Sequence, residues 1–423
     1  MKIVLLYNHN ELDRNVLEPV TYDKFEEKWR EQGGGNSGNK LFISAVEQYI
    51  CQQGVEYGYL DNKLPEQINE EYDLAILPLA NILNANKNVM QQLELYTNLI
   101  EKLSIPVFVI GIGLQTKSYD DIHELAKIIK EPVQRFLKAI YNKGGELALR
   151  GFATKELLDK IDKNTAVVTG CPSMYQKGRN LKISEAKVSQ QDFKPVINGN
   201  LSYLQNIGFI ENFRKYSESV YLDQDEFAEM LYNKNLFNEK IEMKDILKMI
   251  QEKTLVGIEL FCNDRVKLIY DIPVWMDFLS QYDFSCGSRI HGNIIALLSG
   301  VSANVIVRDA RTREIAEFYH VPTVSEKDIC KENDIYDLYL KSDFKKFNDS
   351  FATKYDQFQE FLKKNNIVEN IEDRSFFESK RNAEAWLMPE KSKNIIKVKQ
   401  DYEKRKVVYA FVDVACRIRG KMI

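Results

Sequence analysis

The segment 287–292 (GSRIHG) holds the residues best suited to chemistry, because it lies where an expected strand ends and an expected helix begins. Ligands of open α/β sheets bind beyond the carboxyl ends of the strands, and the free N–H groups of a helix start attract anions. Arg289 adds a permanently charged, forked hydrogen-bond donor, and His291 adds a proton donor that titrates near neutral pH. The segment predicts an anion site with acid–base capacity. The alternative is a helix start with a capping serine, a packed histidine and a surface arginine.

Five more side chains follow expected strands and are predicted to face the same cleft. Arg308 and Arg311 lie in the run VRDARTRE, and either suits two parallel hydrogen bonds to a carboxylate or phosphate. Arg150 ends a strand in the first half of the chain, where a structural salt bridge is the alternative. Ser173 and Gln115 also follow strands there and are candidates for contacting a hydroxyl group.

These positions depend on an alternation of strands and helices in the first half of the chain. Continuous apolar runs such as DLAILPLA and PVFVIG are typical of parallel strands that helices cover on both faces. The alternation predicts a mostly parallel, doubly wound sheet. Its expected strands are Lys2–Tyr7, Asp73–Ala80, Pro106–Gly111, Leu147–Arg150 and Ala166–Thr169, and its expected helices are Lys40–Gln52, Asp121–Tyr141 and Thr154–Lys160.

A second alternating series begins after a polar stretch at about 176–194. Its expected strands are Pro195–Asn198, Leu255–Leu260, Asp283–Cys286 and Ala303–Val307, and its expected helices are Ile290–Ser299 and Thr312–Tyr319. The fold class is therefore α/β, with two tandem Rossmann-like, doubly wound domains that face a cleft. The expected domains are residues 1–183 and 184–341, followed by a helical carboxy-terminal extension at 342–423, of which one helix packs back on the first lobe.

Composition argues against several other classes of protein. The 423 residues carry a net charge of −4, which gives no general attraction to nucleic acid, so none is expected as a partner. Six cysteines occur without CxxC pairs, which disfavours a zinc site or a disulfide framework and favours a reducing compartment. No metal and no cofactor is expected. The motifs of P-loop NTPases, serine hydrolases and zinc proteases are absent, and no apolar run reaches the roughly 20 residues that span a bilayer.

Several of these segments together resemble the polysaccharide pyruvyl transferase family. They are 36–39 (NSGN), 108–115 (FVIGIGLQ), Leu149-Arg150 with Thr154, 168–173 (VTGCPS) and 288–292 (SRIHG), and the resemblance runs from about residue 33 to 325. Each motif alone is weak, and their order together with the Arg-x-His-Gly segment makes the resemblance specific. Relatives usually have Gly-Asp where this chain has Gly38-Asn39, so a negative charge is missing at that point.

The resemblance implies a fold similar to that of the two-lobed GT-B glycosyltransferases, with an acceptor lobe first and a donor lobe second. It implies transfer of a pyruvyl group from phosphoenolpyruvate to two hydroxyls of a cell-surface glycan or its precursor, as a ketal, with release of phosphate. Arg150 and Arg289 then clamp the donor, His291 is the candidate general acid, and Asn36 and Asn39 are candidates for acceptor binding. The partners are the donor and a glycan or lipid-linked oligosaccharide acceptor.

Two other functions remain open from the residues alone. A nucleotide-sugar glycosyltransferase of the same fold would place a diphosphate at the 289–292 helix start. A glycan-binding or scaffold protein descended from such an enzyme would bind neither donor.

The stretch Tyr402–Ile423 (YEKRKVVYAFVDVACRIRGKMI) is expected to form a helix with basic residues at both ends of an apolar stripe. Such a helix either packs its stripe on the first lobe or binds an anionic membrane surface. The expected location is cytoplasmic, with peripheral contact at the inner membrane surface if the second alternative holds.

Overall fold

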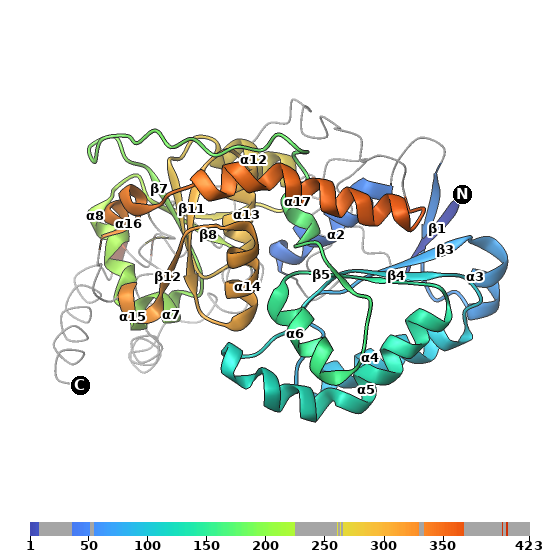
Figure 1. Cartoon of the computed structure of the whole chain (residues 1–423). Coiled ribbons are helices and arrows are strands. Elements are labelled where there is room, and N and C mark those ends of the chain that lie inside the picture. The colour runs from blue at the N-terminus through green and yellow to red at the C-terminus, as the bar shows by residue number, and fades with distance from the viewer. Residues whose placement is uncertain are drawn as a thin grey trace.

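A computed structural model shows two parallel β-sheets, each flanked by helices (Figure 1). The structure describes residues 1–7, 36–50, 55–224, 265–329 and 334–367, together with residues 260, 263, 400, 403 and 404. Within these residues each sheet has six strands, and one sheet comes from each half of the chain. The predicted α/β fold with two Rossmann-like lobes in a GT-B-like arrangement is confirmed.

The first sheet has the strand order β2-β1-β3-β4-β5-β6. Its central strands are apolar throughout, as the runs LAILP and VFVIGI require for burial on both faces, and every residue of these two strands is buried. The strand order reverses direction between β1 and β3. The strands are β1 (Lys2–Leu5), β2 (Glu56–Tyr59), β3 (Leu74–Pro78), β4 (Val107–Ile112), β5 (Leu147–Leu149) and β6 (Val167–Val168).

Helices cover both faces of this sheet. In Figure 1, α4, α5 and α6 lie below it, while α2 and the later helix α17 lie above it. The two faces bury separate apolar clusters, one of which continues into the second lobe. The helices of this lobe are α2 (Ser37–Ile50), α3 (Pro65–Glu71), α4 (Lys87–Lys102), α5 (Ile122–Asn142) and α6 (Phe152–Ile161), with 3-10 turns η1 (Tyr119–Asp121) and η2 (Pro172–Tyr175).

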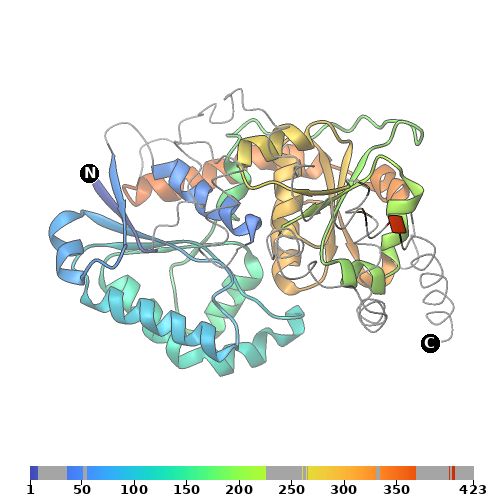
Figure 2. The same cartoon turned by 180° about the vertical axis from the view of Figure 1, so that it is seen from behind.

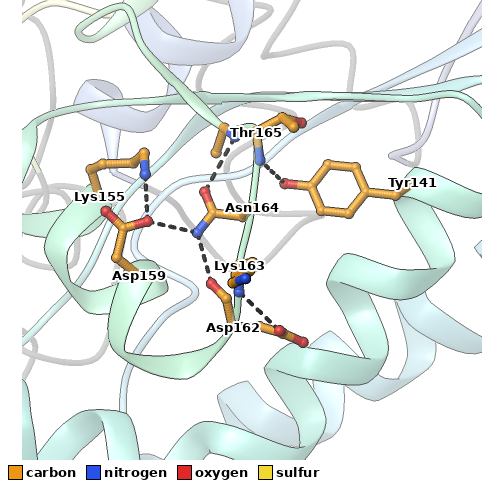
Figure 3. A network of polar contacts seen from close by, with 8 residues as sticks. Tyr141, Lys155, Asp159, Asp162, Lys163, Asn164 and Thr165 are labelled. Atoms are coloured by element: carbon orange, nitrogen blue, oxygen red, sulfur yellow. Dashed lines mark hydrogen bonds and ion pairs between the residues drawn. The ribbon is translucent and has the colours of Figure 1, made fainter.

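The turn from α6 to β6 is fixed by Asn164 (Figure 3). Its side-chain nitrogen donates to Asp159 Oδ1 (3.0 Å), and its side-chain oxygen accepts from the backbone N–H of Ala166 (3.2 Å). The hydroxyl oxygen of Tyr141 on α5 accepts from the N–H of Thr165 (3.3 Å). These bonds fix the segment that precedes β6, so they help to position β6 and the turn η2 that follows it.

The second sheet has the strand order β12-β11-β10-β7-β8-β9, with all pairs parallel. The order reverses direction between β7 and β10, and such a switch point is where doubly wound sheets bind ligands. The strands are β7 (Pro195–Asn198), β8 (Val220–Asp223), β9 (Val266–Leu268), β10 (Phe284–Gly287), β11 (Ser302–Val307) and β12 (Thr323–Ser325).

The helices of the second lobe include α13 and α14, which face the first lobe in both views (Figures 1 and 2). The elements are α7 (Leu201–Asn206), η3 (Phe209–Glu211), α8 (Asn212–Lys215), α12 (Ile272–Leu279), α13 (Ile290–Leu298), α14 (Ala310–Tyr319), α15 (Glu326–Ile329) and α16 (Ile335–Lys341). The helix α14 begins with Asp309 as its cap, which accepts a hydrogen bond from the N–H of Thr312 (2.8 Å).

The long helix α17 (Lys345–Lys364) starts at the second lobe and ends on the first (Figures 1 and 2). Its Phe358 stacks on Tyr175 with ring centroids 5.1 Å apart, and Asn365, just after the helix, donates to Glu146 Oε2 (3.0 Å). The expectation that a late helix packs back on the first lobe is confirmed.

The expected strands and helices are found within a few residues of their predicted ends wherever the structure describes them. Among the described residues the prediction missed four strands and seven helices, namely β2, β8, β9, β12, α3, α4, α7, α8, α12, α15 and α16. The expected strand Leu255–Leu260 lies outside the described residues except for Leu260, which is helical. The stretch Tyr402–Ile423 also lies outside them, apart from Glu403 and Lys404.

Candidate functional site

The carboxyl ends of the strands in the two sheets point toward the boundary between the lobes. In the first sheet, Asn81 follows β3, Gly113 follows β4 and Arg150 follows β5. In the second sheet, Asn198 ends β7 and the segment 288–291 follows β10, on either side of the switch point. Each of these residues follows or ends a strand along the chain, and the order of the strands within each sheet brings the strand ends next to one another.

Arg150 is the most unusual residue at this boundary, because its side chain is 0% exposed although it carries a full charge. Its Nη1 donates to Asn81 Oδ1 (2.9 Å), and its guanidinium lies over the ring of Phe42 (4.8 Å to the centroid). Its Nε and Nη2 have no hydrogen-bond partner among the described residues. A buried guanidinium with two unused donors is suited to hold an anion, because leaving those donors unsatisfied is costly.

His291 lies close to Arg150 across the boundary, on the first turn of α13. Burial lowers the pKa of His291 well below its ordinary value, and the positive charges of Arg150 and Arg311 lower it further. Its Nε2 has no partner within the part of the chain that the structure describes. A Cβ added to Gly38 would stand 3.0 Å from His291 Cβ, so the start of α2 packs directly against this histidine.

A buried amide network fixes the strand–helix turn that carries Arg289 and His291. Asn198 Oδ1 accepts from the backbone N–H of Arg289 (3.0 Å), and Asn198 Nδ2 donates to Asn293 Oδ1 (3.0 Å). Asn293 in turn donates to the carbonyl oxygens of Gly287 (2.9 Å) and Arg289 (3.2 Å). The network satisfies the polar groups of a buried turn and so holds the start of α13 in one position.

The structure brings the predicted arginines together. Burial lowers the pKa of Arg311, and so do the nearby positive charges of Arg150, Arg289 and Arg308, while Asp309 opposes them. Arg311 donates to Asp309 Oδ2 (3.2 Å). Arg308 is exposed, and its guanidinium makes a cation–π contact with the ring of Tyr203, 5.0 Å from the centroid. This clustering of positive charge favours a multiply charged anion.

Glu314 on α14 joins the second lobe to the first and was not predicted from the sequence. Its Oε1 accepts from Thr154 Oγ1 (2.8 Å), and its Oε2 accepts from the backbone N–H of Thr154 (2.9 Å) at the start of α6. Burial raises the pKa of Glu314 to about 7, although the bonds from Thr154 and the charge of Arg150 act in the opposite direction. At the start of the same helix, the backbone N–H of Ala310 donates to the carbonyl oxygen of Thr116 in the first lobe (3.1 Å).

Four predicted site residues in the first lobe have other surroundings. Ser173 is fully buried in η2, where its hydroxyl accepts from Cys171 Sγ (3.4 Å). Gln115 is exposed, and its backbone N–H donates to Leu83 O (2.9 Å). Asn36 caps α2 by accepting from the N–H of Gly38 (2.8 Å), and Asn39 is exposed on the first turn of that helix.

The residues that sequence reasoning missed are Asn81, Asn198, Asn293 and Glu314. One signal for Glu314 was present, because it stands four residues after Ala310 and four before Phe318, on the apolar side of its helix. A carboxylate on that side has to find a buried partner. Nothing in the sequence singled out the three asparagines.

No group of three or more His, Cys, Asp or Glu side chains among the described residues is arranged to hold a metal ion. No helix among them combines the length and the apolar character needed to cross a membrane.

Residues 36–310 match the family model of the polysaccharide pyruvyl transferases. The match covers more than half of the chain and includes Arg150, Arg289, His291 and the first residue of α14. The chain belongs to the polysaccharide pyruvyl transferase family. It is therefore a transferase of polysaccharide biosynthesis, and the family implies phosphoenolpyruvate as donor and a polysaccharide as acceptor.

Solved structures similar to this pyruvyl transferase family member have low sequence identity. The Staphylococcus aureus protein MnaA with UDP is 12% identical, with a TM-score of 0.43 over 87% of this chain and 98% of that one. A UDP-N-acetylglucosamine 2-epimerase is 9% identical, with a TM-score of 0.39 over 88% of this chain and 98% of that one. An uncharacterized protein of Klebsiella pneumoniae is 12% identical, with a TM-score of 0.36 over 77% and 92%. No curated protein matches the chain. At these values the similarities say nothing about the substrate.

Proposed function

We propose that this family member transfers the pyruvyl group of phosphoenolpyruvate to two hydroxyls of a sugar in a cell-surface glycan or its precursor. The product is a ketal, and inorganic phosphate is released. The donor lies between the lobes, against Arg150 from the first lobe and Arg289, Arg308 and Arg311 from the second. In this proposal residues 1–183 form the acceptor lobe, residues 184–341 form the donor lobe, and residues 342–423 form the helical extension.

The observation that carries this proposal is the buried guanidinium of Arg150 with two unused donors. A guanidinium binds a carboxylate or a phosphate through parallel hydrogen bonds, and phosphoenolpyruvate carries both groups. The remaining arginines around Arg311 supply positive charge for the second group. A neutral sugar would leave these charges without a counter-ion, whereas a trianionic donor balances them.

The reaction requires proton transfer in both directions. The C3 carbon of phosphoenolpyruvate gains a proton and becomes a methyl group, while one acceptor hydroxyl loses its proton and adds to C2. Phosphate then leaves C2, and the second hydroxyl adds there as it loses its own proton, which leaves with the phosphate. These steps require a group that donates a proton to C3 and a group that accepts a proton from a hydroxyl, and one side chain that alternates between the two forms can do both.

His291 fits the acid–base role because its Nε2 is unpartnered among the described residues and lies beside the arginines. Its low pKa keeps it neutral at pH 7 while the arginine charges are uncompensated. A bound trianion offsets those charges and raises the pKa of His291, so that the histidine takes up a proton as the donor binds. The protonated imidazole then supplies the proton that C3 requires.

The acceptor is proposed to bind along the first lobe, with Asn36, Asn39 and Gln115 as candidates for contacting its hydroxyls. Asn39 and Gln115 are exposed, as hydroxyl-binding side chains have to be. Asn36 lies at the start of α2, where it accepts from the N–H of Gly38. Ser173, the fourth candidate from the sequence, is fully buried and bonded to Cys171, so it does not face an acceptor. We place the enzyme in the cytoplasm, where phosphoenolpyruvate is available, with a lipid-linked glycan as the acceptor class.

Ligand-dependent melting distinguishes this function from its alternatives. Phosphoenolpyruvate at 100 times its Kd should stabilise the native state by about 2.7 kcal/mol and raise the Tm. A nucleotide sugar should leave the Tm unchanged. The reverse result would indicate a glycosyltransferase, and no shift with either ligand would indicate a protein that binds neither donor. Mass spectrometry of glycan acceptors incubated with enzyme and donor then detects the pyruvyl ketal.

A further inference from the structure

The carboxylate of Glu314 lies beside Arg150 but accepts its hydrogen bonds from Thr154. A Cβ added to Gly113 would stand 3.0 Å from Arg150 Cδ and 3.4 Å from Glu314 Oε1, so the two side chains pack against the same glycine. The charge of Arg150 acts on the pKa of Glu314, which also places them close together. Yet both oxygens of Glu314 accept their hydrogen bonds from Thr154.

Thr154 is itself oriented to make these bonds. Its Oγ1 accepts from the backbone N–H of Leu114 (3.0 Å), which leaves the hydroxyl proton to be donated to Glu314. Its own N–H belongs to the first turn of α6, where helix N–H groups have no partner within the helix and favour a carboxylate. Both donors of Thr154 therefore point at the same carboxylate.

We propose that Thr154 holds the carboxylate of Glu314 away from the Nε and Nη2 atoms of Arg150, which makes Glu314 and Thr154 positioning residues for the donor-binding arginine. The inference rests on the proposed function, because it assumes that Arg150 receives an anion. A carboxylate that pairs with Arg150 competes with any substrate anion for the same two donors. Anchoring Glu314 to the other lobe leaves its charge near the site without occupying the arginine.

The contact between Thr154 and Glu314 also joins the two lobes close to Arg150, which directly follows β5. The N–H of Arg150 donates to Ile112 O (3.0 Å), and Thr154 bonds to Leu114, so the backbone on both sides of Arg150 is tied to the end of β4. Glu314 extends this tie to α14 of the second lobe. The position of the arginine therefore depends on both lobes.

Five variants separate the competing effects. Thr154→Val removes the hydroxyl donor and frees Oε1 of Glu314 to reach Arg150, while the backbone N–H still holds Oε2. Thr154→Ser keeps the hydroxyl and is the matched control. Glu314→Gln removes the competing charge and keeps the tie, because one oxygen at the Oε2 position accepts from both Thr154 N (2.9 Å) and Thr154 Oγ1 (2.9 Å). The double variant Thr154→Val/Glu314→Gln lacks both the restraint and the competitor. Glu317→Gln tests a carboxylate of the same helix that accepts from Tyr119 (2.8 Å) instead of Thr154.

Calorimetric titration with phosphoenolpyruvate and, separately, with inorganic phosphate at pH 8 gives the readout. Thr154→Val should weaken binding of phosphoenolpyruvate about tenfold, as expected when an anion must displace a charge-assisted pair. Thr154→Ser and Glu317→Gln should bind like the wild type, and Glu314→Gln should bind at least as tightly. The double variant should recover wild-type affinity, a rescue that a purely structural role of Thr154 does not produce.

A double variant that binds as weakly as Thr154→Val, or more weakly, overturns the inference. So does a Thr154→Val protein that remains folded and binds like the wild type. If phosphoenolpyruvate does not bind the wild type but inorganic phosphate follows the expected pattern, the proposed function fails and the inference holds. If neither anion binds the wild type, both fail.

Discussion

The hydroxyl of Tyr319, in the second lobe, donates a hydrogen bond of 2.9 Å to the carbonyl oxygen of Cys171 in the first. Two further tyrosines bond to carbonyls of the same turn, Tyr49 to Pro172 O (2.6 Å) and Tyr175 to Thr169 O (2.5 Å). Together with the ring of Phe358 from α17, these tyrosines form a buried aromatic joint between the lobes. The joint holds the turn after β6 at a fixed place relative to α14.

Gly170 lies inside this joint and should not tolerate a side chain. Its φ is +84°, and an added Cβ would stand 2.2 Å from the hydroxyl oxygen of Tyr319. Gly170→Ala should lower the free energy of unfolding by about 2 kcal/mol or more, since left-handed strain and overpacking add. Gly144→Ala is the matched control, because Gly144 has φ +72° with nothing within 4 Å of its Cβ, and should lose only about 1 kcal/mol. Urea denaturation measures both, and equal losses would contradict the clash.

Arg150 and Arg289 should each contribute to donor binding. We expect Arg150→Ala and Arg289→Ala to weaken the binding of phosphoenolpyruvate by about 1.5–3 kcal/mol each, the range for a hydrogen bond to a charged group. Isothermal titration calorimetry on folded variants measures this directly. Arg135→Ala is the control, because Arg135 pairs with Glu101 on the surface of α5 and should bind the donor normally. Unchanged affinity in either test variant would remove that arginine from the donor site.

His291 should be required for transfer and should take up a proton when the donor binds. His291→Ala should abolish ketal formation and leave the fold intact. Because burial and the arginine charges hold the pKa of His291 low, donor affinity in the wild type should rise as pH falls from 8 toward 6.

Calorimetry in buffers of different ionisation enthalpy counts the protons taken up on binding. His291→Asn serves as the control, since it shows the uptake by all groups other than His291, including the donor phosphate and Glu314. Equal proton uptake in the variant and the wild type, or transfer by His291→Ala at neutral pH, would falsify the acid–base role.

The buried carboxyl of Glu314 should make stability depend on pH. Burial raises the pKa of Glu314 from its ordinary value of 4.5 to about 7, so between these values the folded state binds more protons than the unfolded state. The contribution of the protonated group to stability is therefore fully present below about pH 4.5 and is lost as pH rises through about 7.

Glu314→Gln is neutral at every pH and lacks this loss. The difference in the free energy of unfolding between the two proteins should move in favour of the variant by roughly 1–3 kcal/mol from pH 5 to pH 8. Denaturation of both proteins at the two pH values measures it, and subtraction removes the titration of all other groups. A difference that does not change with pH would mean that the carboxyl titrates normally.

The carboxy-terminal stretch Tyr402–Ile423 should decide whether the enzyme binds membranes. Its basic residues at both ends of an apolar stripe suit an anionic surface, where lipid-linked acceptors lie. Full-length protein should co-sediment with anionic liposomes at low salt, and a protein ending at Gln400 should not. If both proteins stay in the supernatant, the stretch packs on the protein instead.

The sequence by itself determined the class of fold and the part of the site that depends on local order. Continuous apolar runs predicted strands that are buried on both faces, and segments with helical spacing between them predicted the helices that cover those faces. This alternation, present twice along the chain, predicted two parallel sheets. The same local rule placed Arg289 and His291 at a helix start after a strand, and Arg150 at the end of another. Their residue types then indicated an anion site, and the motifs in order indicated the family.

Only the tertiary structure decided how these residues meet. The strand order sets β7 beside β10 and places β3 and β5 on either side of β4, so Asn198 reaches Arg289 and Asn81 reaches Arg150 across 91 and 69 residues of sequence. Glu314 meets Thr154 across 160 residues, and the cost of burying its charge becomes visible only when the lobes pack together. Periodicity records which face of an element is buried, whereas the partner on that face depends on the path of the whole chain.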